Sequence, residues 1–273
     1  MKNYNGKGTC KLYKEGDRMK CAVYTATRNM YDRLIPSLKS LLINSDVEKV
    51  YLLIEDDTFP VELPSVVECI NVSDQKYFRA MGPNNVYPWA YMSMMRAALC
   101  KVLLDVDMVL SLDVDTIIDG DISELWDYPL EDCYFAAVAE PDRCTADKLY
   151  TNTGVAIFNL DKLRDGKADQ IIDVLNWRRF FILEQDCLNE YCQGAIAALP
   201  SKYNKSDFTA PCDTPVIVHY AGIREWDYIP LVQKYKDIPW SEIRKPKRSR
   251  RKEEETRPSG VLSDNGRIFD EMA

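Results

Sequence analysis

The chain has 273 residues, of which 46% are hydrophobic and 11% aromatic, so it can bury a sizeable core and is not a disordered protein. Its formal charge of -8 argues against a broad surface for nucleic acid or anionic membranes, because most of the molecule would repel phosphate. The 9 cysteines include no C-x-x-C pair, which predicts reduced, mostly buried thiols rather than a zinc or redox site.

The sequence shows neither a charged and then apolar N-terminal leader nor an apolar run long enough to span a membrane, so we expect a soluble, cytoplasmic protein. Its single histidine, His219, excludes mechanisms that need a histidine cluster. We expect one domain over residues 1–242. Residues 243–273, in which a basic block precedes an acidic one, are expected to form a charged helix or tail.

Strand and helix patterns alternate in the first part of the chain. A buried strand is predicted over residues 21–25, followed by a helix over 31–44 with leucines at helical spacing. Two more strands are predicted over 47–55 and 66–70, and the segment 89–101, rich in Met, Ala and Leu, is predicted to be helical. Such alternation favours an α/β fold with a mostly parallel sheet.

A pair of aspartates follows a well-defined strand pattern in the middle of the chain. The apolar run 108–112 has the length and branching of a buried strand, and it is followed by Asp113 and Asp115. Two carboxylates at a strand end can converge on one hard cation, which can in turn hold a diphosphate. Alternatively, an Asp-rich turn only solvates or caps. Asp121 or Ser123 could cap the short helix that we expect next.

The second half of the chain continues the alternation. Strands are predicted over 134–139, 154–158 and 216–220, and helices over 160–180 and 184–192. The last strand would leave His219 near its end, much as the earlier strand leaves Asp113. By itself, His219 is better explained as a hydrogen-bonded core histidine. Arg96, a cation in an apolar helix, needs either a structural carboxylate or a ligand phosphate as its partner.

Four motifs in this order make the chain resemble the retaining glycosyltransferases of family 8, a group that includes glycogenin and bacterial lipopolysaccharide galactosyltransferases. They are TATRNMY at 25–31, Arg96 followed by DVDT at 113–116, NTGVAIFNL at 152–160 with EQDCLN at 184–189, and HYAG at 219–222. The resemblance covers roughly residues 19–240. It implies a GT-A fold, in which a Rossmann-like, mostly parallel sheet flanked by helices binds a nucleotide-sugar at the carboxyl ends of its strands.

The resemblance also implies a metal site. Asp113, Asp115 and His219 would ligate manganese, or magnesium, which bridges the two phosphates of a UDP-sugar. Two carboxylates and an imidazole suit such an ion chemically.

The same resemblance assigns residues to the donor. Thr25, Thr27 and Tyr31 would hold the uridine, with the Tyr31 ring able to stack on the base, although Tyr31 could also be simply the first apolar residue of a helix. The other donor-binding positions are Arg96, Val114 between the two aspartates, Asn152, Gly222 and Arg224. The catalytic positions around the transferred sugar are Glu184, Gln185 and Asp186, where polar side chains can select the pattern of hydroxyl groups.

Two departures from the family pattern stand out. Glu184 occupies a position that is often Asp in the family, so donor preference could differ. The closing HYAGIREWD keeps Gly222 but has Glu225 where the family has Lys, unless a deletion brings Arg224 into that register. Gln185 is a poor nucleophile, so we favour attack from the face that UDP leaves, inside an ion pair, over a covalent route through Glu184 or Asp186.

The resulting expectation is a metal-dependent retaining glycosyltransferase. It would move a hexose, with glucose and galactose as leading candidates, from a UDP-sugar to a hydroxyl acceptor that is a glycan, protein or lipid. One alternative is a catalytically silent module that binds a sugar or a partner. Another is a nucleotidyltransferase, although no Gly-rich basic loop that could hold a triphosphate follows the first strand.

Overall fold

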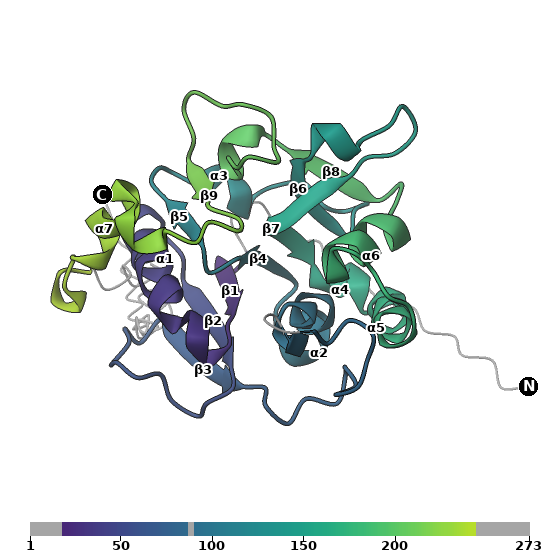
Figure 1. The fold of residues 1–273 in the computed structure, drawn as a ribbon, viewed down its shortest axis with the longest axis horizontal. Helices are drawn as coiled ribbons and strands as arrows, with labels where there is room; N and C mark the ends of the chain where they lie inside the picture. Colours follow the sequence, from purple (N-terminus) through teal and green to yellow (C-terminus); the bar gives the residue numbers. More distant parts are fainter. Residues whose placement is uncertain (1–17, 87–89, 244–273) are drawn as a thin grey trace, which may run out of the picture.

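The structure, a computed structural model, describes residues 18–86 and 90–243, and a seven-stranded sheet forms the centre of this part (Figure 1). The strands, in the order β3-β2-β1-β4-β7-β6-β8, are β1 (Cys21–Thr25), β2 (Lys49–Ile54), β3 (Val67–Asn71), β4 (Met108–Leu112), β6 (Phe135–Ala139), β7 (Thr151–Asn159) and β8 (Ile196–Leu199). Strands β1 to β4 are parallel, β7 is antiparallel to β4 and β6, and β8 is parallel to β6. The predicted α/β fold with a mostly parallel sheet is confirmed.

A second, two-stranded sheet lies above the carboxyl end of β4. It pairs β5 (Thr116–Ile118) with β9 (Ile217–His219) in antiparallel register, so that Thr116 lies opposite His219. Strand β5 begins directly after the two aspartates, and this register therefore brings His219 beside them. The sequence predicted β9, which belongs to the run VIVHY at 216–220, but not β5, whose three residues lie between Asp115 and Asp119 and form no apolar run of strand length.

Helices cover both faces of the large sheet, and β1 shows why. Its side chains alternate, so that Ala22 and Tyr24 join the core beneath α1 (Tyr31–Asn44), whereas Cys21 and Val23 join the core on the opposite face. Both faces are apolar because both are buried between layers. Figure 1 shows the resulting three layers, with α1 on one side of the sheet and α2, α4, α5 and α6 on the other.

Two of the helices predicted on the second face are shorter in the structure, whereas the one predicted over 184–192 is present as α6. The helices on this face are α2 (Leu99–Val102), α4 (Leu160–Leu163), α5 (Lys167–Trp177) and α6 (Leu183–Tyr191). The helix predicted over 89–101 is wrong over most of its described length, because 3-10 turns precede α2. The helix predicted over 160–180 is interrupted at Gly166, whose φ of 94° is left-handed, and it ends at Trp177. Short 3-10 turns lie at Arg28–Met30, Ala90–Met92, Met94–Ala98, Pro141–Arg143, Ser201–Tyr203, Trp226–Tyr228 and Trp240–Glu242.

The short helix α3 (Ser123–Trp126) begins differently from the prediction. Its capping residue is Ile122, which makes no side-chain cap, so neither Asp121 nor Ser123 holds that position. The Asp121 carboxylate nevertheless accepts the backbone N–H of Ser123 at 2.8 Å, and so satisfies a donor of the first turn from one residue further back.

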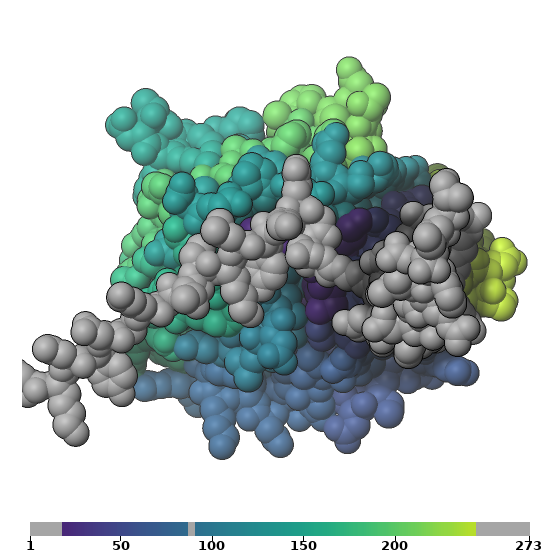
Figure 2. All heavy atoms as spheres, turned by 180° about the vertical axis from the view of Figure 1, so that it is seen from behind, coloured from purple at the N-terminus to yellow at the C-terminus, as the bar shows by residue number. Residues whose placement is uncertain are grey.

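A last helix, α7 (Pro230–Lys236), packs beside α1 and was not predicted. Lys39 of α1 is 5% exposed, and its Nζ donates to the carbonyl oxygens of Lys236 at 2.9 Å and Ile238 at 2.6 Å, which caps the end of α7. Seen from behind in Figure 2, α7 forms one side edge and the blue segment that follows β2 forms the lower surface. No helix in the described residues is long and apolar enough to cross a membrane. The predicted charged tail lies, from residue 244 on, outside the described residues.

Candidate functional site

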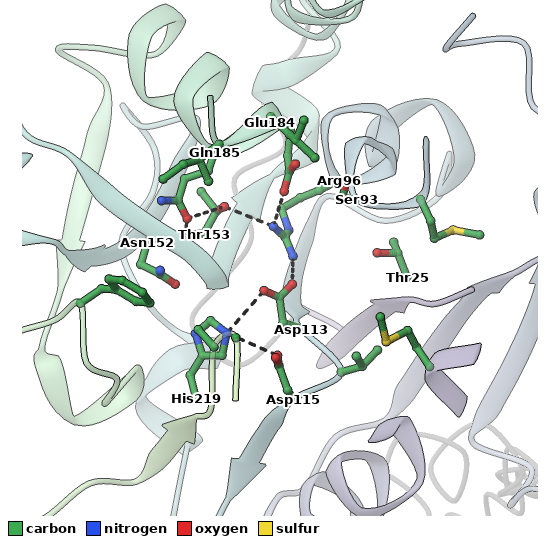
Figure 3. Close-up of a pocket in the computed structure, with 18 of the residues that line it drawn as sticks. Thr25, Ser93, Arg96, Asp113, Asp115, Asn152, Thr153, Glu184, Gln185 and His219 are labelled. Atoms are coloured by element: carbon green, nitrogen blue, oxygen red, sulfur yellow. Dashed lines mark hydrogen bonds and ion pairs between the residues drawn. The ribbon is translucent and has the colours of Figure 1, made fainter. Parts of the chain in front are cut away.

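A cavity of about 930 Å³ opens where the carboxyl ends of β1 and β4 meet the beginning of β7 (Figure 3). Because β7 runs against β4, its first residues lie at the same sheet edge as the last residues of the parallel strands. The predicted residues that line the cavity are Thr25, Thr27, Arg96, Asp113, Val114, Asp115, Asn152, Glu184, Gln185, His219, Gly222 and Arg224. The predicted residues Tyr31 and Asp186 are not among the lining residues.

Asp113, Asp115 and His219 converge at the floor of the cavity. Each offers one ligand atom, and these atoms lie within 4.8 Å of one another. His219 Nε2 lies 3.5 Å from Asp113 Oδ2 and 3.4 Å from Asp115 Oδ1. Burial opposes protonation of the imidazole, yet the hydrogen bond and charge of Asp115 raise the pKa of His219 above its ordinary value. Two carboxylate oxygens and an imidazole could hold a divalent cation.

Strand β7 packs directly against this cluster at Gly154. A Cβ at this position would lie 2.1 Å from His219 Cε1 and 2.8 Å from Asp113 Oδ2, which no side chain could tolerate. The backbones of the two residues also form a hydrogen bond, because Asp113 N donates to Gly154 O at 2.7 Å. The absence of a side chain at residue 154 therefore lets Asp113 and His219 approach each other, and Asp113, Asp115 and His219 fit a cation site of three protein ligands.

Arg96 is buried between two carboxylates (Figure 3). Its Nη1 donates to Glu184 Oε1 at 2.8 Å and its Nη2 pairs with Asp113 Oδ1. Its remaining contacts are Nε to Ser111 Oγ and Nη1 to Thr153 Oγ1, each at 3.2 Å. Of the two partners considered for this cation, a structural carboxylate or a ligand phosphate, carboxylates are present. The guanidinium of Arg96 thereby connects the possible metal ligand Asp113 to Glu184 in the first turn of α6.

The pKa values of Glu184 and Asp113, the two carboxyl groups paired with Arg96, are shifted in opposite directions. Burial raises the pKa of Glu184 to about 7, and the positive charge of Arg96 only partly offsets this effect. For Asp113, burial acts in the same direction but the charges of Arg96 and His219 prevail and hold its pKa below the usual range. A carboxyl group poised near neutrality inside a cleft is typical of functional sites.

Gln185 belongs to a hydrogen-bonded network on the wall opposite β1. Its Oε1 accepts from Thr153 N at 3.0 Å, and its Nε2 donates to Glu140 Oε1 and to Tyr150 Oη, each at 3.1 Å. Asn152 Nδ2 donates to the same Glu140 oxygen at 2.8 Å. Glu140 was not among the predicted site residues, although an acid directly after the strand predicted over 134–139 was a signal that could have identified it.

Asp186 is not among the residues that line the cavity, and other groups of the protein bind its carboxylate. Its Oδ1 accepts from Arg143 Nη2 at 2.8 Å and from Tyr150 Oη at 2.6 Å. Its Oδ2 accepts the N–H of Ile182 at 2.7 Å. These contacts lower the pKa of Asp186 against the opposing effect of burial, and they give it the role of a residue that joins α6 to the loop after β6.

Tyr31 is also displaced from its predicted role. Its side chain is 5% exposed, its ring centroid lies 4.7 Å from that of Phe59, and its hydroxyl donates to Asp56 Oδ2 at 2.9 Å. It therefore belongs to the core, as the simpler interpretation of a first apolar helix residue held. Its neighbour Met30 lines the cavity instead, together with Arg33 one turn further along.

Two exposed phenylalanines also line the cavity. Phe181 is 91% exposed and Phe208 54% exposed, and both contribute to the cavity surface. They lie in loops without apolar periodicity, so no sequence pattern identified them. Asn204, which contacts His219, was missed for the same reason.

Comparison with known proteins identifies the family. The sequence model of glycosyl transferase family 8 matches residues 23–229, which is most of the chain. A Haemophilus influenzae protein that is provisionally named a glycosyltransferase is 23% identical over 125 residues, which are 40% of this chain and 37% of that protein.

Solved structures agree. The glycosyltransferase GlyE of Streptococcus pneumoniae TIGR4 has a TM-score of 0.63 and 20% identity, covering 83% of this chain and 62% of GlyE. The galactosyltransferase LgtC, solved with donor and acceptor sugar analogues, has a TM-score of 0.61 and 18% identity, covering 80% of this chain and 97% of LgtC. This chain thus spans less than two thirds of GlyE and of the Haemophilus protein. The structural similarity to GlyE and LgtC shows the shared GT-A fold, and the match over residues 23–229 shows that the chain belongs to glycosyl transferase family 8.

Proposed function

We propose that this protein is a retaining glycosyltransferase that uses a divalent metal ion, manganese or magnesium, to move a hexose from a UDP-sugar to an acceptor hydroxyl. Glucose and galactose are the leading candidates for the sugar, and a glycan, protein or lipid for the acceptor. One observation carries the proposal: Asp113, Asp115 and His219 line the same cavity as the Arg96–Glu184 ion pair.

The metal-facing residues would hold the diphosphate end of the donor. Asp113, Asp115 and His219 offer two hard oxygens and one imidazole, and an ion bound by them would act as a Lewis acid on the leaving diphosphate. Arg96 keeps Asp113 oriented through their ion pair, and its buried positive charge lies at the same end of the cavity. Gly222, with a left-handed φ of 75°, and Arg224, two residues later, also line the cavity. The guanidinium of Arg224 could supply a positive charge to the phosphates in addition to the metal ion.

The uridine would lie along the loop after β1. Thr25 and Thr27 line this part of the cavity and offer hydroxyl groups, and Met30 rather than Tyr31 supplies the apolar surface against which a base could pack.

The sugar would lie against Asn152, Glu184 and Gln185. The hydrogen bonds to Thr153 N and Glu140 fix the amide of Gln185, and its Oε1 also accepts a longer bond from Thr153 Oγ1 at 3.4 Å. The partial negative charge of this oxygen could stabilise a positively charged, oxocarbenium-like sugar. An amide is a poor nucleophile, which favours attack by the acceptor from the face that UDP leaves.

Binding of UDP tests the proposal. Calorimetric titration of UDP with and without Mn²⁺ is expected to show binding that depends on manganese. A following screen of UDP-sugars is expected to reveal slow release of UDP from one of them, which would identify the donor. Absence of UDP binding under both conditions would contradict the proposal and shift attention to another nucleotide or to a silent binding module.

Replacement of Gln185 by alanine is expected to lower the turnover number about 10²-fold without eliminating it, because the variant loses one polar group near the developing charge. Turnover would be measured as UDP release at saturating donor. Gln170→Ala, which changes an exposed glutamine of α5, is the matched control and should turn over normally. Complete loss of turnover in Gln185→Ala, with donor binding retained, would instead favour a nucleophilic role.

A further inference from the structure

We propose that Asn204 is a positioning residue that fixes the tautomer and orientation of His219, so that Nε2 presents its lone pair to the cation site. The catalytic role of Asn204 rests on the proposed function. Its effects on Mn²⁺ affinity and on the protonation of the His219 ring can be measured without any sugar donor.

Asn204 is in direct contact with the histidine. Its side chain is completely buried, and its Oδ1 lies 3.0 Å from His219 Nδ1. The other ring nitrogen, Nε2, faces Asp113 and Asp115. A carbonyl oxygen can only accept a hydrogen bond, so the contact requires a proton on Nδ1. In a neutral imidazole, a proton on Nδ1 leaves Nε2 unprotonated. A ring nitrogen must be unprotonated to bind a metal ion.

The orientation of the Asn204 amide follows from the groups on its other side. The Glu140 carboxylate accepts a hydrogen bond from Asn152 at 2.8 Å, so that atom of Asn152 is Nδ2. Asn152 Oδ1 then accepts from the backbone N–H of Gly154 at 3.1 Å and from Asn204 Nδ2 at 2.9 Å. Consequently the oxygen of Asn204 must be the atom that faces His219. One carboxylate and one backbone N–H thereby set the polarity of the whole chain of hydrogen bonds.

The backbone around Asn204 holds the side chain in place. Thr209 Oγ1 donates to Asn204 O at 2.7 Å. On the next residue, Lys205 N donates to Ile217 O at 2.9 Å, and Lys205 O accepts from His219 N at 2.9 Å. Because the segment after Asn204 pairs with β9, the strand that carries His219, the two side chains are fixed relative to each other by main-chain hydrogen bonds.

Two variants separate positioning from mere stability. Asn204→Ala removes the acceptor, and we expect it to weaken Mn²⁺ affinity by about 10- to 100-fold, the usual effect of losing such a partner of a metal ligand. Asn204→Asp keeps an oxygen facing Nδ1 but loses the donor to Asn152 Oδ1, so it is expected to bind Mn²⁺ more tightly than Asn204→Ala and less tightly than the wild type. The matched control is Asn84→Ala, because Asn84 is equally buried but bonds to Leu175 O and Arg178 O outside the cavity.

The readouts are Mn²⁺ affinity, from the electron paramagnetic resonance signal of free Mn²⁺, and the ring ¹⁵N shifts of histidine in the Mg²⁺-saturated protein. The chain has 1 histidine, so tag-free, ¹⁵N-histidine-labelled protein gives one pair of ring signals. We expect a protonated Nδ1 and an unprotonated Nε2 in the wild type and in Asn204→Asp, with the pattern changed in Asn204→Ala.

Several results would overturn the inference. They are wild-type affinity and unchanged ring signals in Asn204→Ala, an equal loss of affinity in Asn84→Ala, failure of Asn204→Asp to restore binding, or no Mn²⁺ binding by the wild type. If the variants behave as expected but no UDP-sugar is turned over, the role of Asn204 stands and the proposed transferase activity fails.

Discussion

Asp115→Asn is expected to lower turnover by about 10³-fold or more while the protein stays folded. A bound metal contributes several kcal/mol to stabilising transition-state charge, and every 1.36 kcal/mol lost corresponds to a tenfold loss of rate. An asparagine retains the shape of the side chain, and the backbone bond from Tyr220 N to Asp115 O, at 2.9 Å, does not depend on the carboxylate. UDP release would be measured beside the urea midpoint of unfolding.

Asp173→Asn provides the control for this substitution, since it makes the same chemical change at an exposed position of α5. It should leave both turnover and the urea midpoint unchanged. Wild-type turnover in Asp115→Asn would mean that the Asp113–Asp115–His219 cluster does not carry the metal. Loss of turnover together with a much lower urea midpoint would show a structural rather than a ligand role.

Arg96→Met should remove activity and also lower the free energy of unfolding, by about 3 kcal/mol, because it leaves the buried Glu184 and the half-buried Asp113 without their shared cation. The positive charge of Arg96 now lowers the pKa of Glu184, so its loss should raise that pKa further. The double variant with Glu184→Gln removes one of the two orphaned carboxylates. It is therefore expected to recover part of the stability but none of the activity.

Urea denaturation of four proteins checks this prediction: the wild type, the two variants and Arg178→Met. The last removes an exposed ion pair, Arg178 with Glu190, whose side chains are 52% and 39% exposed, and should cost less than about 1 kcal/mol. If Arg96→Met were as stable as Arg178→Met, the buried ion pairs would make no net contribution, and Arg96 would serve only ligand binding.

The fold could be predicted where the pattern is long. The leucines of α1 and the apolar runs of β1 and β4 show clear periods, and these elements occur where they were expected. The elements that the sequence did not predict are short: β5 has three residues, β8 has four and α7 has seven. Such segments gain their structure from tertiary pairing, which local periodicity does not encode.

Some residues of the site could be predicted from the sequence and others could not. The three possible metal ligands and Arg96 could be found because motif order identifies them. Tyr31 and Asp186 were assigned to the site, but neither lines the cavity; Met30, which was not predicted, lines it beside Tyr31, and of the predicted neighbours of Asp186, Gln185 lines it. Successive residues on a helix point about 100° apart, since a turn contains 3.6 residues, so an error of one position changes which side chain faces a ligand.

Glu140 and Asn204 could not be found in this way. They act through Asn152, Gln185 and His219, partners that are 12 to 45 residues away in the chain. Hydrogen bonds between side chains at such separations leave no repeating pattern in a single sequence, and only the folded arrangement of β7, β9 and the loops reveals them.

The tight fit at Gly154 bears on how the protein can be altered by design. Strand β7 has no room for even a methyl group beside His219, so a library of substitutions at this position would consist almost entirely of inactive or misfolded proteins. The exposed loop residues Phe181 and Phe208 border the same cavity and meet no such restriction. An engineer who wants new substrates should therefore diversify the loops and leave the strand untouched.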